Sequence, residues 1–449
     1  MDASQIRTKV DALMPQVTAD LGKLVTLPSI AFPGFPSEPV VACAEAVVDV
    51  LKGYGCTEAR LLEIPGGYSA AYAEVAGPEG APTVMMYGHY DVQPAPIEQG
   101  WLTDPWTPTI KDGRMFGRGA ADNKSSVVIS GASVAVFDGK PPVNVKIITE
   151  GEEETISHLE AFVEANPELF ECDVFIIADM GNLKVAEPIT TTTLRGDVAC
   201  TVHVETLDHP LHSGVFGGPA PDALMALIRM CAQLVDDEGT VAVPGVEAYD
   251  WPGADLPADV FRTNAGVLDG VELIGTGTVG TRLWSKPSIN VLGIDCPAVH
   301  EAANILIPTA TAKVSMRIVP GADPQVEMDK LLAYLRSIAP WGAKVEVRPA
   351  KALNAFIAKT DGPGYAAARR AMREAFGVDP SEAGSGGSIP LLGTLAQAVP
   401  NAEFILWGAE DMAQSRIHGA NESVELEEIA TCIRAQANLL HMLGGVGNS

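Results

Sequence analysis

The chain has 449 residues, of which 47% are hydrophobic and 19% charged, a composition typical of a globular protein with more than one domain. Its formal net charge of −27 would repel a nucleic-acid backbone and an anionic membrane surface, so neither is an expected partner. The seven cysteines contain no Cys-x-x-Cys pair and the N-terminus resembles no secretory leader, which together predict a cytoplasmic protein without disulfides.

The first 180 residues alternate between strand, loop and helix patterns. Apolar residues recur at helical spacing over 4–26 and 39–53. Strands are predicted at 83–88, 143–148 and 174–178, with a helix at 125–137 between the first two. This alternation is typical of an α/β fold with a mostly parallel sheet flanked by helices.

After residue 195 the pattern changes, and near residue 350 it changes back. The middle region alternates like a strand at 199–204 and 312–319 and reads as a helix at 222–235. The last hundred residues predict a helix at 365–376, a strand at 403–407 and a helix at 426–442. We therefore expect one domain formed by residues 1–195 and 351–449, interrupted by an inserted α+β domain of residues 196–350.

The three early strands each run into acidic residues or a histidine. These residues are His89 and Asp91 after the first strand, Glu150 and Glu152 to Glu154 after the second, and Asp179 after the third. In open α/β sheets, ligands bind outside the carboxyl ends of the strands, so these side chains are expected to converge. Several unpaired carboxylates in one place repel each other, and a bound cation would relieve that repulsion.

Each of these signals also has a purely structural explanation. The His89 and Asp91 pair could form an ordinary hydrogen bond, the acidic run could be a solvated helix start, and Asp179 could cap a turn. His212 lies in a polar turn, where a histidine is usually solvated, and His418 follows a strand and a loop.

Several motifs, in order along the chain, bear a resemblance to one known family. They are Gly88-His89-Tyr90-Asp91-Val92-Gln93-Pro94, Gly117 to Lys124 with Asp122, Glu150 to Glu154, Leu211-His212-Ser213-Gly214, Ser315-Met316-Arg317 and Gly386-Gly387-Ser388-Ile389-Pro390. The chain resembles the dinuclear zinc metallopeptidases, which include carnosinases and cytosolic dipeptidases, carboxypeptidase G, aminoacylases, and acetylornithine and succinyl-diaminopimelate deacylases. The segment from His89 to Pro94 looks most like the carnosinase-like dipeptidase branch.

The resemblance implies two divalent metal ions, with zinc expected and manganese or cobalt as alternatives. His89 and Asp179 would hold one ion, and Glu154 and His418 the other. Asp122 would bridge the two. Histidine nitrogen and carboxylate oxygen suit zinc.

The resemblance also implies the catalytic groups. Glu153 would act as general base on a water between the ions and then as acid toward the leaving amine, and Asp91 would orient His89. The expected substrate is a dipeptide with a free C-terminal carboxylate. The alternatives are an N-acyl amino acid cleaved by the same groups, or a non-catalytic scaffold, although every expected ligand and the base are present.

By the same resemblance, the inserted domain would be a lid that also forms a homodimer. His212 would reach the partner's active site to support the oxyanion. Arg317, Asn304 and the loop with Gly387 and Ser388 would grip the substrate carboxylate. Two departures from the family pattern are Asn123, where many relatives have a second aspartate, and Ser385, where carnosinase-like members have a glutamate. Neither is an expected metal ligand, and only Ser385 bears on the substrate pocket.

Overall fold

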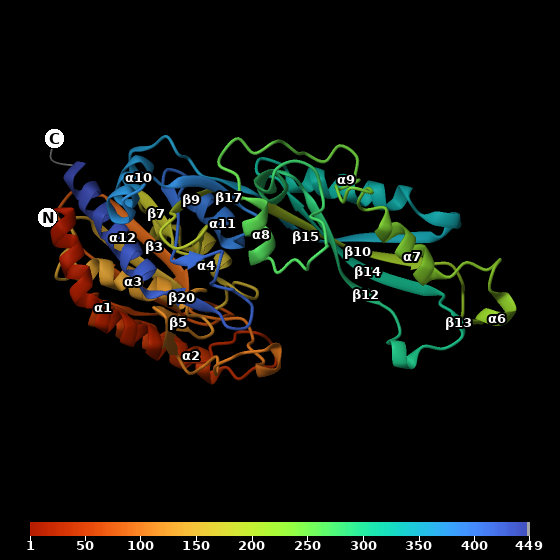
Figure 1. Cartoon of the computed structure of the whole chain (residues 1–449), viewed down its shortest axis with the longest axis horizontal. Coiled ribbons are helices and arrows are strands. Elements are labelled where there is room, and N and C mark those ends of the chain that lie inside the picture. The colour runs from red at the N-terminus through yellow and green to blue at the C-terminus, as the bar shows by residue number, and fades with distance from the viewer. Residues whose placement is uncertain (447–449) are drawn as a thin grey trace.

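The computed structural model describes residues 1–446 and has two lobes of unequal size (Figure 1). Both termini lie on the larger lobe, and the smaller lobe is built from the middle of the chain (Figure 1). Within residues 1–446, no helix combines the length and the apolar character needed to cross a membrane.

The larger lobe is organised around a nine-stranded mixed sheet. In spatial order its strands are β1 (Arg60–Leu62), β2 (Ala70–Val75), β6 (Asn144–Glu150), β3 (Thr83–His89), β7 (Val174–Ile177), β18 (Glu403–Leu406), β9 (Ile189–Leu194) and β16 (Phe356–Ile357), and β17 (Ser381–Ser385) also pairs with β9. The central strands β6, β3, β7 and β18 are parallel to their neighbours in that order. Antiparallel pairs lie on both sides of this parallel centre. The α/β prediction is confirmed, and its parallel part is the centre of the sheet.

Helices cover both faces of this sheet. They are α1 (Ala3–Val25), α2 (Glu38–Gly53), α3 (Lys124–Ala135), α10 (Pro363–Phe376) and α12 (Leu426–Val446) on one face, and α4 (Leu159–Ala165), α5 (Pro167–Phe170) and α11 (Pro390–Ala398) on the other. Successive side chains of a strand point to opposite faces. Accordingly Val84 and Met86 of β3 pack with the first group, whereas Met85 and Tyr87 pack with the second.

Helix α3 is buried on all sides, between α1, α2 and α12. Small residues make this possible: a Cβ atom at Gly131 would lie 2.5 Å from the ring of Tyr54. Because α3 begins two residues after Asp122, its packing fixes the position of that aspartate in the larger lobe.

The smaller lobe is built around a second, antiparallel sheet. Its strands, in spatial order, are β12 (Ser288–Asp295), β14 (Thr309–Ile318), β10 (Gly196–Glu205) and β15 (Lys344–Leu353). Helices α7 (Ala223–Ala232) and α9 (Pro324–Ser337) share its apolar core, and α6 (Ser213–Phe216) lies at the far end of the lobe (Figure 1). Helix α8 (Ala258–Asn264) lies where the lobes meet, and its Phe261 packs in a cluster that includes Ile189 and Ala383 of the large sheet (Figure 1). Arg195 alone separates β9 of the large sheet from β10 of the small one.

Candidate active site

The ends of three parallel strands bring the predicted ligands to one edge of the large sheet. His89 is the last residue of β3, Glu154 lies in the turn after β6, and Asp179 follows β7 by two residues. Asp122 enters from the loop before α3. His418 enters from the loop between β19 (Glu410–Asp411) and β20 (Ser423–Glu425). Because β6, β3 and β7 are adjacent and parallel, their carboxyl ends meet at the same rim.

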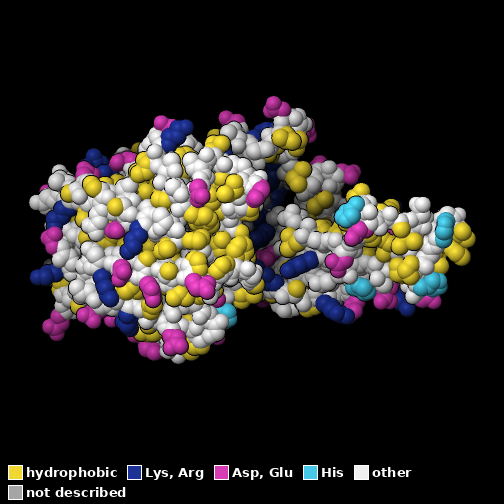
Figure 2. Space-filling model, turned by 90° about the horizontal axis from the view of Figure 1, so that it is seen from below, with side chains coloured by type: hydrophobic (Ala, Val, Ile, Leu, Met, Phe, Trp, Pro, Cys, Tyr) yellow, Lys and Arg dark blue, Asp and Glu magenta, His cyan; other side chains and the backbone are white. Residues whose placement is uncertain are grey.

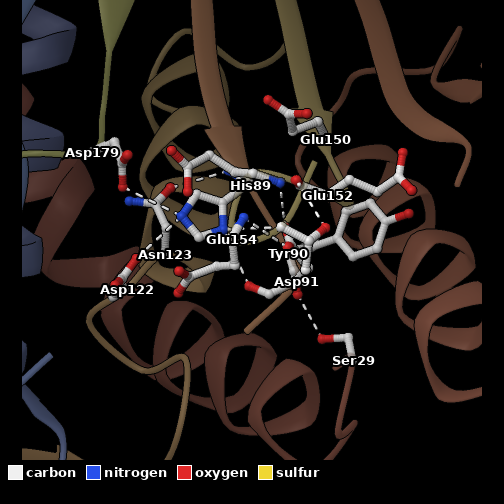
Figure 3. A network of polar contacts seen from close by, with 12 residues as sticks. Ser29, His89, Tyr90, Asp91, Asp122, Asn123, Glu150, Glu152, Glu154 and Asp179 are labelled. Carbon is white, nitrogen blue, oxygen red and sulfur yellow. Dashed lines mark hydrogen bonds and ion pairs between the residues drawn. The ribbon is translucent and has the colours of Figure 1, made fainter. Parts of the chain in front are cut away.

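The five side chains form two groups that share Asp122. Figure 3 shows His89, Asp122, Glu154 and Asp179 of these groups. In the first group, Nε2 of His89 lies 3.1 Å from Oδ1 of Asp122 and 3.4 Å from Oδ1 of Asp179. In the second, Nε2 of His418 lies 3.0 Å from Oδ2 of Asp122 and 3.2 Å from Oε1 of Glu154. Each oxygen of Asp122 therefore faces a different group, the arrangement of a carboxylate that bridges two cations.

The donor atoms of the first group fit a metal ion. Nδ1 of His89 lies 3.1 Å from the backbone carbonyl oxygen of Asp91, and a carbonyl only accepts, so this nitrogen carries the proton. Nε2 then faces the carboxylates of Asp122 and Asp179, so either a second proton on this nitrogen or a bound metal ion lies between them. Burial lowers the pKa of His89, but the charge of Asp179 and hydrogen bonds to Asp122 outweigh burial and raise it well above its ordinary value. A metal ion at this position would compete with that proton.

The second group leaves an acceptor without a donor. Oε1 of Glu154 is buried and lies 3.2 Å from Nε2 of His418 without the geometry of a hydrogen bond, and no other residue within 1–446 donates a hydrogen bond to it. Buried polar atoms are rarely left unsatisfied, so this oxygen also points to an absent cation. The nearby carboxylates of Asp122 and Glu154 raise the pKa of His418 to about 10. Nitrogen and carboxylate oxygen in both groups suit zinc or a similar divalent metal.

Glu153 lines the same cavity as Asp122, Glu154 and Asp179. Burial raises the pKa of Glu153 well above its ordinary value; the charge of His89 opposes this, while Asp179 and Glu154 add to it. A carboxylate whose pKa is raised toward neutrality is suited to accept a proton and then to donate it.

Asp91 supports this site in two ways. Its carboxylate accepts hydrogen bonds from the backbone amides of Glu153 at 3.1 Å and Glu154 at 3.0 Å. The same carboxylate lies 3.4 Å from Nδ1 of His89, farther than the backbone oxygen of Asp91 (Figure 3). Asp91 thus ties the turn with the two glutamates to the end of β3, a function that the sequence did not suggest.

Two buried residues that hold the candidate metal ligands in position were not identified from the sequence. Glu422 accepts hydrogen bonds from the amides of Ala121 and Asp122, and its other oxygen lies 2.6 Å from Nη1 of Arg118. Asn123, noted above as a departure, accepts a hydrogen bond from the amide of His89 and donates one to the carbonyl of Ala178. Asn123 thereby links the ends of β3 and β7. The only available signal was the position of each residue beside a predicted ligand motif.

The cavity of about 830 Å³ extends from these groups toward the junction of the lobes, and Figure 2 shows Lys and Arg side chains gathered where the lobes meet. Arg317 of β14 donates a hydrogen bond to Oγ of Ser388 at 2.7 Å, and Arg195 donates one to the carbonyl of Gly386. Burial, followed by the charge of Arg317, lowers the pKa of Arg195 to about 10. Gly387 also lines this end of the cavity. Two guanidinium groups close together favour an anion there.

His212 and Asn304 do not line this cavity. His212 ends β11 (Leu211–His212), which pairs with β13 (Ile305–Leu306), and the carbonyl of Asn304 accepts a hydrogen bond from the amide of Ser213. β13 and α6 lie at the far end of the smaller lobe (Figure 1). Within one chain, Asn304 therefore stands beside His212 and does not join Arg317 as we expected, because the pairing of β11 with β13 holds it at that far end.

Comparison with known proteins places the chain among peptidases. A model of the family described as "Peptidase family M20/M25/M40" matches residues 85–442. A cysteinylglycine-S-conjugate dipeptidase of Corynebacterium striatum is 39% identical over 81% of this chain and 82% of its own. A Beta-Ala-His dipeptidase of Rattus norvegicus is 33% identical over 78% of this chain and 75% of its own. The crystal structure of human carnosine dipeptidase 1 superposes with a TM-score of 0.83, at 26% identity and 99% coverage of both chains. The chain therefore belongs to peptidase family M20/M25/M40.

Proposed function

We propose that the protein is a metal-dependent dipeptidase that hydrolyses the amide bond of dipeptides with a free C-terminal carboxylate. The observation that carries this proposal is that carboxylates of both metal-binding groups, Glu153 and a pair of arginines line a single cavity. The names of the relatives from Corynebacterium striatum and Rattus norvegicus support a dipeptide substrate.

The metal ions that we propose are two zinc ions. His89 and Asp179 would hold one, Glu154 and His418 the other, and Asp122 both. When bound, the ions would supply Lewis acidity that lowers the pKa of a water molecule and polarises the scissile carbonyl. The measurement that tests this is the metal content of the protein purified without added metal. We expect two zinc ions per chain, and one ion or fewer per chain, or a different metal, would contradict the proposal.

Glu153 is the proton carrier in this proposal. Its side chain takes the proton from the attacking water and gives it to the nitrogen of the leaving amino acid. Asp91 keeps Glu153 in place through the backbone of the turn. At the other end of the cavity, Arg317 and Arg195 bind the substrate carboxylate beside Gly387 and Ser388, which fixes the scissile bond relative to Glu153.

The substitution Glu153→Gln tests the catalytic proposal, because glutamine keeps the size of the side chain but cannot accept the proton. We expect the metal content to be unchanged and kcat to fall by at least about two orders of magnitude. Unchanged turnover would remove Glu153 from the mechanism. A parallel substrate panel compares dipeptides with N-acetyl and N-succinyl amino acids. Turnover of the acylated compounds alone would replace the dipeptidase proposal with a deacylase.

We further propose that residues 196–350 form a lid and dimerisation domain inserted between residues 1–195 and 351–449. His212 and Asn304 lie far from the cavity of their own chain, which supports a contribution to the partner's site. Apolar side chains are exposed on the same lobe; they are Val215, Phe216, Val291, Leu292 and Ile305. Exposed apolar side chains of this kind are suited to burial in an interface between two chains.

Mixed dimers test whether His212 acts in the partner's site. Glu153→Gln and His212→Asn chains are each expected to be nearly inactive alone. In a mixed dimer, one of the two sites has both residues intact. Equal mixing should therefore restore about a quarter of the wild-type activity, since half of the dimers are mixed. No recovery after confirmed subunit exchange would contradict the contribution in trans.

We also place the protein in the cytoplasm. All seven cysteines are free thiols, and Cys43, Cys56, Cys200 and Cys432 are buried. Free thiols are typical of proteins in reducing compartments. Cell fractionation with antibodies against the chain tests the location, and recovery from an extracytoplasmic fraction would contradict it.

A further inference from the structure

We propose that the carboxylate of Glu410 binds the free amino group of the substrate, so that the enzyme selects peptides with an unblocked N-terminus over N-acylated compounds. This proposal rests on the dipeptidase function proposed above and names the group that would determine its substrate class.

Glu410 is held beside the metal-binding groups by a short strand pair. β19 pairs in parallel with β8 (Gly181–Asn182), and Glu410 is in register with Gly181, two residues after Asp179. Glu410 lines the same cavity as Asp122, Glu153 and Asp179. The pairing therefore fixes Glu410 at the wall where the scissile bond and the substrate's amino-terminal residue would lie.

Glu410 is only 8% exposed, although it lines the cavity. Among residues 1–446, no group donates a hydrogen bond to its carboxylate or forms an ion pair with it. A buried charge without a partner is costly, so such a group usually has a ligand. Burial, with the charges of Asp122 and Asp179, raises the pKa of Glu410 well above its ordinary value, and a cationic ligand would reverse this effect.

The other carboxylates of the cavity already have functions. Asp122, Glu154 and Asp179 belong to the metal-binding groups, and Glu410 belongs to neither group found within residues 1–446. Asp411 lies 2.8 Å from Nη2 of Arg114 and accepts a hydrogen bond from Ser415. Glu153 is the proposed proton carrier. Glu410 is the carboxylate of this cavity that remains without a function.

The charges of the cavity match a zwitterion. Two divalent ions carry four positive charges. The carboxylates of Asp122, Glu154 and Asp179 would offset three of these charges, and Glu153 would offset the fourth. An ionised Glu410 then makes this end of the cavity negative. Arg195 and Arg317 make the other end positive. A dipeptide has a positive amino group at one end and a carboxylate at the other, whereas an N-acyl amino acid has only the carboxylate. Only the dipeptide complements both ends.

The test compares wild type with Glu410→Gln on an unblocked dipeptide and on its N-acetyl derivative. A charge-assisted hydrogen bond predicts that kcat/KM for the unblocked dipeptide falls about 10- to 100-fold in the variant, while turnover of the N-acetyl derivative is unchanged. Residual turnover of the N-acetyl derivative also shows that the variant is folded. Glu410→Asp should recover part of the preference. Glu346→Gln, on an exposed strand of the smaller lobe, is the matched control.

Binding provides a second measurement that does not depend on turnover. A phosphinic dipeptide analogue with its amino group should bind wild type about 10- to 100-fold more tightly than the analogue without it, and the two should bind Glu410→Gln equally. An unchanged preference in Glu410→Gln would overturn the proposal and leave the dipeptidase function intact. Loss of metal from Glu410→Gln would also overturn it, because Glu410 would then be a metal ligand. A wild type that cleaves only acylated substrates would refute the dipeptidase function itself.

Discussion

The substitution Glu422→Gln tests whether a buried ion pair holds the bridging Asp122 in place. Glu422 is fully buried, accepts hydrogen bonds from the amides of Ala121 at 3.0 Å and Asp122 at 3.1 Å, and contacts Arg118 at 2.6 Å. Glutamine keeps an acceptor for the two amides but leaves the guanidinium of Arg118 buried without its counter-charge. Removing one partner of a buried pair costs about 3–5 kcal/mol, so we expect the free energy of unfolding to fall by that amount.

A second effect is expected at the metal centre. Loss of the residue that orients a ligand typically weakens metal binding by about 10- to 100-fold. Urea denaturation of the metal-free protein measures the first effect, and competition with a chelator measures the second. Glu425→Gln is the matched control, because Glu425 lies 3.8 Å from Arg114 and is partly exposed; its loss should cost less than about 1 kcal/mol.

The double substitution Glu422→Gln with Arg118→Met separates the two causes. If the unpaired guanidinium is responsible for the lost stability, removing it as well should recover part of the loss. Metal affinity should stay low, because the loop that carries Asp122 still lacks the ion pair between Glu422 and Arg118. A double variant that loses the full sum of both single effects would refute this reasoning.

Two further predictions concern the substrate carboxylate and pH. Arg317→Met should raise KM for dipeptides about 10- to 100-fold and leave C-terminally amidated dipeptides unaffected, as measured by steady-state kinetics; equal losses on both would contradict a carboxylate contact. Burial raises the pKa of Glu150 from 4.5 to about 7, so the folded chain binds this proton more tightly than the unfolded chain. Stability should therefore fall as pH rises from about 4.5 through 7, and Glu150→Gln should remove that fall in urea titrations of the metal-free protein.

The main part of the fold and three of the five metal-binding positions could be predicted from strand patterns. The strands that end near His89, Glu154 and Asp179 are apolar and parallel, and ligands bind at the carboxyl ends of such strands. The structure has them as β3, β6 and β7 within two residues of the predicted ends. For Asp122 and His418 the sequence pattern predicted only that each lies in a loop next to the end of a helix or strand. Their prediction as metal ligands came from the family resemblance.

Glu422 and Glu410 could not be predicted because their local sequence has no periodic signal. Glu410 belongs to a strand of two residues, and Glu422 precedes one of three. Strands this short leave no alternating pattern to recognise. Their burial also depends on partners far away in the sequence: Arg118 is 304 residues from Glu422. Whether a charged residue is buried depends on the residues that surround it in the folded chain, and these residues cannot be read from the sequence.

The carboxylate end of the cavity shows why the two lobes must be considered together. Arg317 comes from the small sheet and Ser388 from the loop after β17 of the large sheet, 71 residues later, and they meet at 2.7 Å. Arg195, the single residue between β9 and β10, contributes its backbone oxygen to the same Ser388 hydroxyl. A rotation of the lobes about this junction would separate Arg317 from Ser388 before it disturbed either metal-binding group. The substrate binding proposed for this end would therefore depend on the orientation of the lobes, whereas the geometry of the two metal-binding groups depends on the larger lobe alone.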